Sequence, residues 1–181
     1  MPRITVPVQM RWSDIDGYGH VNNAAMLTLL EEARVTTFWQ AGSNPDDDSL
    51  PEQPDGDRPG AQDGHDRPTG EGPDVDAVAG VLAGGTDTDT HTLVARQEIE
   101  YLAPLTYTQD PVPVQLWIGH LGGASLDVCY EVFTPQGQVC ARAATSLVMI
   151  DARTGQPRRL TDTERRTLQT LVDEPITFRR R

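Results

Sequence analysis

Hydrophobic and mostly polar residues alternate near the start of the chain. The hydrophobic positions are Ile4, Val6, Val8, Met10 and Trp12. A period of two puts alternate side chains on one face of an extended chain, and this pattern is typical of a half-buried strand. The sequence therefore predicts a first strand that carries all five of these side chains.

From about Asn22 to Gln40 the hydrophobic positions follow a helical period. They are Met26, Leu27, Leu30, Ala33, Thr37 and Phe38, with Leu29 and Trp39 widening the stripe. So broad an apolar surface indicates a helix that is mostly buried. Asn22 or Asn23 is a suitable N-cap, and Gly42, shortly before an Asn-Pro pair, is a suitable stop.

After this helix the sequence shows four strand-like runs and no second long apolar helix. The runs cover about 92–102, 112–121, 124–133 and 138–150. Residues 134–137 (Thr-Pro-Gln-Gly) favour a turn, so the last two runs are predicted to form a hairpin. If these four residues make the turn, Cys140 lies opposite Glu131.

A short terminal helix is predicted over 161–173, where Thr161 and Glu164 have the spacing of a capping box. The element order is thus a strand, a long buried helix and about four antiparallel strands. One apolar helix wrapped by one antiparallel sheet is a stable α+β arrangement. The sheet has two open edges, and we expect the long run 138–150 to pair with a second copy, which predicts a homodimer.

The charge of the chain is distributed unevenly. Residues 43–78 contain eleven acidic residues and two arginines, which accounts for −9 of the net charge of −12. This segment is also rich in proline and glycine and has no aromatic residue. It cannot bury enough apolar surface to offset its chain entropy. We therefore predict a disordered acidic insertion at 43–78, within a single domain formed by 1–42 and 79–175.

Composition excludes several classes of function. All fifteen basic residues are arginine, so a lysine Schiff base and a P-loop lysine are excluded. The acidic balance argues against a nucleic-acid partner. Cys129 and Cys140 are the only cysteines, too few for a disulfide scaffold and without the spacing of a zinc site. No run approaches the roughly 18 apolar residues of a membrane span, and the first twelve residues do not resemble a signal peptide. We expect a soluble, cytoplasmic protein.

The segment from Arg11 to Asn23 carries the most distinctive chemistry. It places Asp14 and Asp16 beside two glycines, between the first strand and the buried helix. The first backbone N–H groups of a helix have no helical partner, and the helix dipole is positive there. A carboxylate beside such amides can attack a carbonyl or activate water while the amides hold the developing oxyanion. This arrangement indicates acyl transfer.

Three segments together carry a family resemblance. They are 14–23 (Asp-x-Asp-x-x-Gly-His-Val-Asn-Asn), 32–34 (Glu-Ala-Arg) and 100–105 (Glu-Tyr-Leu-Ala-Pro-Leu). They resemble the catalytic loop, the helix motif and the second strand of hotdog-fold acyl-CoA thioesterases of the 4-hydroxybenzoyl-CoA thioesterase type. The resemblance covers the chain except for the insertion, and it implies a single hotdog domain with a sheet of about five strands.

This resemblance implies hydrolysis of an acyl-CoA to a free acid and CoA, without a metal or redox cofactor. Asp16 would be the catalytic carboxylate, as nucleophile or as general base on water, and the backbone N–H of Asn23 would polarise the thioester carbonyl. Asp14 is expected to be structural. The substrate-binding residues implied are Gly19, His20, Val21 and Asn22. In this family the site lies at a dimer interface, so we expect a homodimer or a tetramer built from dimers.

Each of these roles has an alternative. Asp16 is also a common turn or helix-cap residue, and His20 suits an ordering hydrogen bond better than acid/base catalysis. Glu31 and Glu32 are expected to be solvated or paired with arginine, although other hotdog branches use a helix carboxylate for catalysis. Three arginines after the last strand can contact CoA phosphates, but exposure to solvent is the ordinary expectation for them. They are Arg153, Arg158 and Arg159.

Two other functions remain open from the sequence. A hotdog hydratase or dehydratase needs an Asp/His pair, and the chain offers Asp16 and His20 but lacks an Asp-x-Asn-Pro-x-His element. A non-catalytic hotdog protein that binds an acyl thioester, or serves in an assembly, has no need of a carboxylate in the catalytic loop.

The acidic insertion is predicted to be dispensable for folding. Deleting residues 46–74 should leave a folded, soluble dimer, because the segment contributes almost no apolar surface. Circular dichroism and size-exclusion chromatography of the deletion variant check this expectation. Loss of the soluble dimer would show instead that the segment belongs to the folded domain.

Overall fold

The computed structural model describes residues 3–39, 78, 80–82 and 89–179. Apart from Val78, the predicted insertion lies outside these residues. Val78 is buried in the hydrophobic core together with Leu82. The helices and strands are β1 (Ile4–Val8), the 3-10 helix η1 (Trp12–Asp14), α1 (Asn23–Phe38), β2 (Thr90–Tyr101), β3 (Val112–Leu121), β4 (Ser125–Phe133), β5 (Val139–Asp151) and α3 (Asp162–Gln169).

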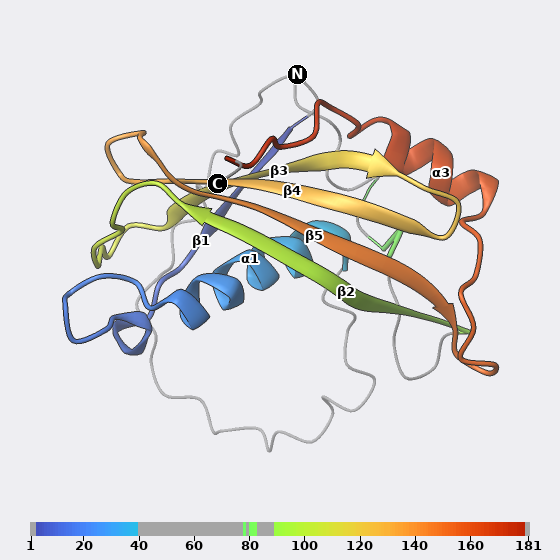
Figure 1. The fold of residues 1–181 in the computed structure, drawn as a ribbon, viewed down its shortest axis with the longest axis horizontal. Coiled ribbons are helices and arrows are strands. Elements are labelled where there is room, and N and C mark those ends of the chain that lie inside the picture. Colours follow the sequence, from blue (N-terminus) through green and yellow to red (C-terminus); the bar gives the residue numbers. More distant parts are fainter. Residues whose placement is uncertain (1–2, 40–77, 79, 83–88, 180–181) are drawn as a thin grey trace, which may run out of the picture.

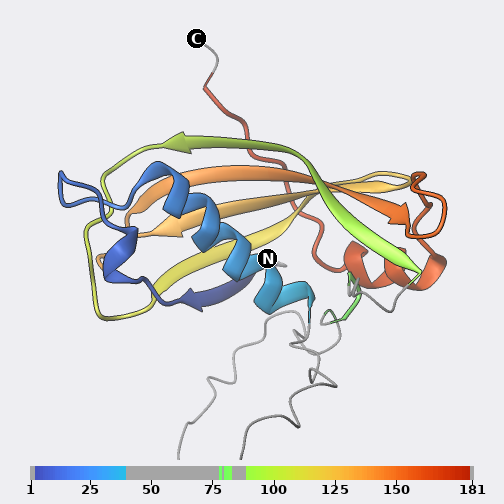
Figure 2. The same ribbon diagram turned by 90° about the horizontal axis from the view of Figure 1, so that it is seen from below.

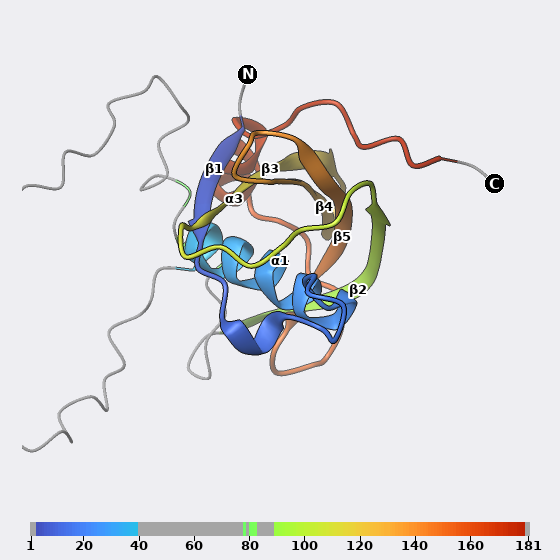
Figure 3. The ribbon, with the colours of Figure 1, turned by 90° about the vertical axis from the view of Figure 1, so that its left-hand side faces the viewer.

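One antiparallel sheet of five strands forms the body of the molecule, in the order β1-β3-β4-β5-β2 (Figure 1). Seen from its end, the sheet curves around α1, which lies in the concave face (Figure 3). Figure 2, a view from below, shows the same helix crossing obliquely in front of the strands. The predicted α+β hotdog arrangement is confirmed, because a single helix buries its apolar stripe against one face of the sheet.

Strand β1 follows the predicted alternation only in part. Ile4, Val6 and Val8 are buried, and the residues between them are exposed. Met10 is buried as well, but Trp12 is 79% exposed. The prediction for Trp12 was wrong because the chain leaves the strand after Val8 and turns into η1, which ends the period-two geometry.

Helix α1 begins as its sequence predicts. The Asn22 side chain accepts a hydrogen bond of 2.8 Å from the Ala24 amide, which makes Asn22 the N-cap. The helix ends at Phe38 and lies closest to β1 and β3. Its buried hydrophobic residues are Met26, Leu29, Leu30, Ala33 and Phe38. This packing determines where the first turn of α1 lies relative to the strand ends.

The edges of the sheet are β1 and β2, not β5. Strand β5 pairs with β4 on one side and with β2 on the other, so the expectation that 138–150 forms an open edge was wrong. The reason is that β2, although early in the chain, crosses over to the outer side of β5. Strand β2 exposes three large hydrophobic side chains, which are Leu93, Val94 and Tyr101.

The hairpin between β4 and β5 forms, but in another register than predicted. Glu131 lies opposite Arg142 rather than Cys140. The Thr134 amide donates to the Gln138 carbonyl oxygen, so the turn includes one more residue than predicted, and the pairing shifts again near Cys140. An irregularity of this kind changes the opposing residue and interrupts the alternation, since the consecutive residues Cys140 and Ala141 are both buried.

The end of the chain packs along β3, and Leu168 and Leu171 belong to the hydrophobic core. Thr161 and Glu164 form the predicted capping box at the start of α3. Beyond α3, the chain passes over β3, where the Trp117 indole donates to the Glu174 carbonyl oxygen at 2.8 Å. Within the described ranges, no helix has both the length and the apolar character needed to cross a membrane.

Candidate active site

The loop before α1 is closed on itself by hydrogen bonds around Asp16. Ile15 and Val21 form an isolated β-bridge, and the Asp16 amide donates to the His20 carbonyl oxygen at 2.8 Å. The Asp16 Oδ1 accepts from the amides of Tyr18 (2.8 Å) and His20 (3.1 Å). Its second oxygen, Oδ2, accepts no hydrogen bond from any described residue. The carboxylate is therefore held in one orientation with one oxygen available.

Gly19 and Asp14 explain how the sequence makes this loop. Gly19 has φ of +82°, a conformation that other residues rarely adopt. Asp14 is 4% exposed, and its carboxylate accepts from both the amide and the guanidinium of Arg11. The Asp14 carbonyl oxygen accepts from the Asn22 amide. Asp14 thus ties the two ends of the loop together, which is the structural role expected for it.

The segment after β2 holds the loop in place. The Val21 amide donates to the Leu105 carbonyl oxygen at 2.8 Å, and His20 forms an isolated bridge with Thr106. The Tyr101 hydroxyl donates to the Asn23 carbonyl oxygen at 3.2 Å. Partial desolvation of this half-exposed side chain raises the pKa of the Tyr101 phenol. Two segments about eighty positions apart therefore form one wall.

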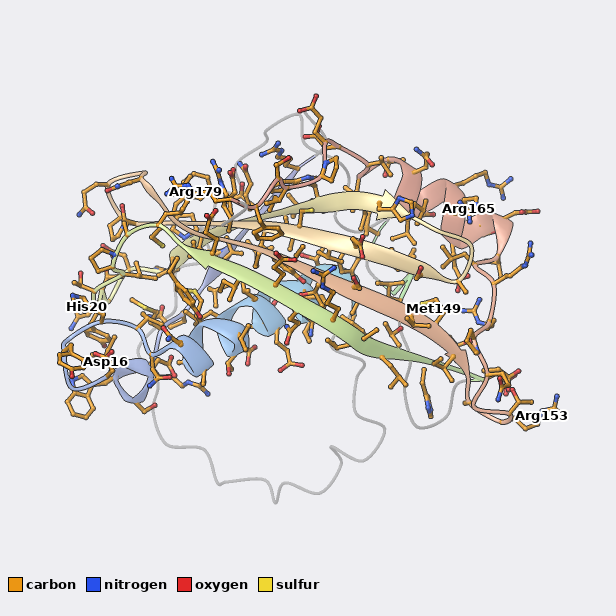
Figure 4. All side chains as sticks on the ribbon, in the orientation of Figure 1. Asp16, His20, Met149, Arg153, Arg165 and Arg179 are labelled. Atoms are coloured by element: carbon orange, nitrogen blue, oxygen red, sulfur yellow. The ribbon has the colours of Figure 1, made fainter. Side chains whose placement is uncertain are left out.

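A pocket of about 370 Å³ lies where these segments meet. Four of the predicted site residues line it, and Figure 4 shows Asp16 and His20 together at this end of the molecule. The complete lining is Asp16, His20, Val21, Asn23, Met26 and the segment 101–105. Among the described residues, no group of three His, Cys, Asp or Glu side chains is suited to hold a metal.

The amide of Asn23 is the free donor of this pocket. Asn23 is the first residue of α1, and its N–H has no acceptor among the described residues. The next amide, of Ala24, is already capped by Asn22. A free amide at a helix start carries partial positive charge, which stabilises an oxygen that becomes negative. The pocket is thus lined by both a carboxylate and an unpaired helix-start amide.

Other sequence-predicted residues lie elsewhere or act differently. Gly19 and Asn22 are not part of the lining, since Gly19 shapes the loop and Asn22 caps the helix. His20 orders the loop as predicted, although through its backbone. Arg158 is paired with Glu164 at 2.6 Å. Arg153 lies at the opposite end of the molecule from Asp16 (Figure 4).

The sequence-based prediction missed the contribution of residues 101–105 to the pocket. Their likeness to a family strand was noted, but no site role was given to them. Nothing in their local pattern indicates contact with Asp16, because that contact depends on where β2 lies in the sheet. The bridge between His20 and Thr106 is the feature that brings the segment to the loop.

Comparisons with known proteins identify the family of the chain. Residues 10–168 match the family described as the thioesterase-like superfamily. A search of curated proteins finds no match. A predicted thioesterase from Bacillus stearothermophilus has a similar structure, with a TM-score of 0.66, 22% identity, and coverage of 96% of this chain and 98% of the other.

Two further solved structures are similar. A thioesterase from Thermus thermophilus, complexed with coenzyme A and zinc, shares 26% identity, with a TM-score of 0.58 and coverage of 95% of this chain and 96% of the other. A 1,4-dihydroxy-2-naphthoyl-CoA thioesterase from Synechocystis has 17% identity and a TM-score of 0.64, with coverage of 92% of this chain and 96% of the other.

Two glycines of the loop form a matched pair for testing its conformation. An added Cβ meets nothing within 4 Å at either Gly17 or Gly19, but only Gly19 has a positive φ. Gly19→Ala should therefore lower the free energy of unfolding by about 1–2 kcal/mol, and Gly17→Ala should change it far less. Urea denaturation of both variants measures the difference. Equal effects would show that the left-handed conformation is not required.

Proposed function

The chain belongs to the thioesterase-like superfamily and is a thioester hydrolase, and we propose that it hydrolyses an acyl-CoA to a free acid and CoA in the pocket of Asp16 and Asn23. One observation carries the proposal: a carboxylate with a free oxygen and a free helix-start amide line the same pocket. The Thermus relative, complexed with coenzyme A, supports CoA as the thiol part of the substrate.

The proposed reaction uses both groups at once. The Asn23 N–H binds the thioester carbonyl oxygen and stabilises the negative charge that forms there. As a nucleophile, the Asp16 Oδ2 bonds to the carbonyl carbon, the C–S bond breaks, CoA leaves as a thiolate, and water then hydrolyses the acyl-aspartyl anhydride. As a general base, Asp16 takes a proton from water that attacks the same carbon, and the C–S bond then breaks to release CoA, whose sulfur takes up the proton. Both routes need the oriented carboxylate.

We further propose that the enzyme works as a dimer joined along β2. Among the described residues, no strand lies on the outer side of β2, and the strand exposes Leu93, Val94 and Tyr101. A second copy that adds its own β2 would bury these side chains and satisfy the open backbone groups. The edge predicted from the sequence was a different strand, but the reason for dimerisation is the same.

This pairing places one end of each copy beside the opposite end of its partner, across the interface. Identical strands related by a two-fold axis pair antiparallel, so the Thr90 end of one β2 adjoins the Tyr101 end of the other. Thr90 lies opposite Asp151, next to the exposed Arg153. Arg153 has no ion-pair partner among the described residues, and it is proposed to reach the phosphates of CoA bound at the other copy's Asp16.

Removing the free carboxylate oxygen should abolish hydrolysis. Asp16→Asn is expected to reduce kcat by about 100-fold or more on an acyl-CoA that the wild type hydrolyses, because it loses the nucleophile or base. Thiol release from short, medium, long and aromatic acyl-CoAs provides the measurement. Asp110→Asn, at an exposed aspartate outside the pocket, is the control for the charge change and should match the wild type.

Two other results would contradict the proposed role of Asp16 or the proposed function. If Asp16→Asn stays folded by circular dichroism and remains as active as the wild type, the catalytic role of Asp16 is wrong. If the wild type releases no thiol from any of these substrates, the hydratase and the binding-protein alternatives become the leading functions.

Comparing two substrates distinguishes a phosphate contact of Arg153 from an effect of the substitution on folding. Arg153→Glu should raise KM for an acyl-CoA by about tenfold, since a contact to a charged phosphate is lost and replaced by repulsion. KM for the matching acyl-pantetheine, which lacks the nucleotide phosphates, should not change. Arg166→Glu, an exposed arginine on α3, is the control. An equal rise of KM for both thioesters would contradict a phosphate contact.

A further inference from the structure

Arg34 is a buried cation that the proposed reaction does not use. It lies on α1 and is 3% exposed. Its guanidinium has five N–H donors, yet within the part of the chain that the structure describes Nη1 reaches only the Tyr130 hydroxyl at 3.3 Å and Nη2 only Glu31 at 3.4 Å. Nε has no partner among the described residues. Both bonds exceed the usual N–H···O range, so this charge is incompletely satisfied for its burial.

A row of polar side chains extends from Arg34 across the concave face. Tyr130 on β4 is opposite Ala143 of β5, and Thr145, two residues further along β5, is its diagonal neighbour on the same face. The Gln97 amide on β2 donates to the Thr145 hydroxyl at 3.5 Å. The neighbouring inward positions of β4 and β5 are apolar, among them Val128. The polar row is therefore a local feature of an otherwise hydrophobic surface.

Helix α1 and strand β2 both lead from the pocket to this row. On α1, Arg34 shares one face of the helix with Asn23, Leu27 and Glu31. Three turns of helix, about 16 Å, separate Asn23 from Arg34. On β2, inward positions run from Tyr101 to Gln97, which is about 13 Å. At the pocket end the two elements are joined by the bond from Tyr101 to Asn23. At the far end the polar row joins Gln97 to Arg34.

The strip between these two ends suits an acyl chain. Strand β5 contributes only the small residues Ala141 and Ala143 opposite Tyr101 and Ile99 of β2. Leu27 and Ile99 are half-buried, which leaves apolar surface accessible along the strip. Since a carbon–carbon bond of about 1.5 Å advances an extended chain by roughly 1.3 Å, a chain of about ten to twelve carbons spans the strip.

We propose that Arg34 binds a carboxylate at the distal end of the acyl group, so that the preferred substrates are ω-carboxyacyl-CoAs of about ten to twelve carbons. This inference rests on the proposed function, because it takes the thioester to lie at Asn23. A carboxylate accepts two parallel N–H bonds from a guanidinium. Glu31, whose side chain is 61% exposed, already places a carboxylate at one edge of Arg34 and is the group that the substrate displaces.

The test compares dodecanoyl-CoA with the CoA thioester of the dicarboxylic acid of equal length. The ratio of their kcat/KM values should favour the carboxylate by at least about tenfold in the wild type. Arg34→Met should bring the ratio to one or below, and it is expected to fold, because apolar replacement of a buried charge is often tolerated. Arg166→Met, at an exposed arginine on α3 away from β2 and the pocket, is the control and should keep the wild-type ratio.

Glu31→Gln is a second test, which changes an exposed side chain. It is expected to change the ratio in the direction opposite to Arg34→Met. Removing the competing carboxylate should raise the same ratio several-fold, because Arg34 is then freed for the substrate. A wild-type ratio of one or below, or a ratio that Arg34→Met or Glu31→Gln does not change, contradicts the proposal.

The experiment distinguishes failure of the carboxylate subsite from failure of the proposed function. Equal hydrolysis of both thioesters refutes the carboxylate subsite alone, whereas failure to hydrolyse either refutes the proposed function. The ratio of dissociation constants for the two thioesters on Asp16→Asn, measured by calorimetry, still tests the subsite in that case. A preference of at least about tenfold supports it, and equal binding refutes it.

Discussion

Burial of one face of α1 in the concave sheet is the interaction on which the rest of the structure depends. It fixes the first turn of the helix beside the end of β2, where the Tyr101 hydroxyl meets the Asn23 carbonyl oxygen. The loop of Asp16 is then held between the helix and the segment 101–105 by the bond from Val21 to Leu105. A carboxylate and a free amide converge only because these long-range contacts hold both.

Local periodicity predicted most of the fold, because helices and strands of this length carry their own patterns. The start of α1 at Asn22, the four later strands and the capping box at Thr161 all follow from neighbouring residues. The position of β2 at the sheet edge does not, since strand order depends on a crossover and not on alternation. The exposure of Trp12 and the register opposite Glu131 were missed for a similar reason, because a turn or an irregularity changes geometry within one or two residues.

The site was predictable to the extent that its residues are close in sequence. Asp16, His20, Val21 and Asn23 occur within one loop and line one pocket. The segment 101–105 reaches that pocket only through tertiary contacts, and so does the polar row at Arg34. In the proposed dimer, pairing along β2 would cover the strip between α1 and β2. One interface would then complete both the CoA site and the acyl site, which explains why a single copy leaves so much apolar surface on β2.

The central claim is that the thioester lies between Asp16 and the Asn23 amide. The most direct test is a crystal structure of Asp16→Asn with an intact acyl-CoA bound. We expect the thioester oxygen to lie about 2.7–3.2 Å from the Asn23 nitrogen, with position 16 facing the carbonyl carbon. A thioester bound elsewhere, with the Asn23 amide facing water, would contradict it.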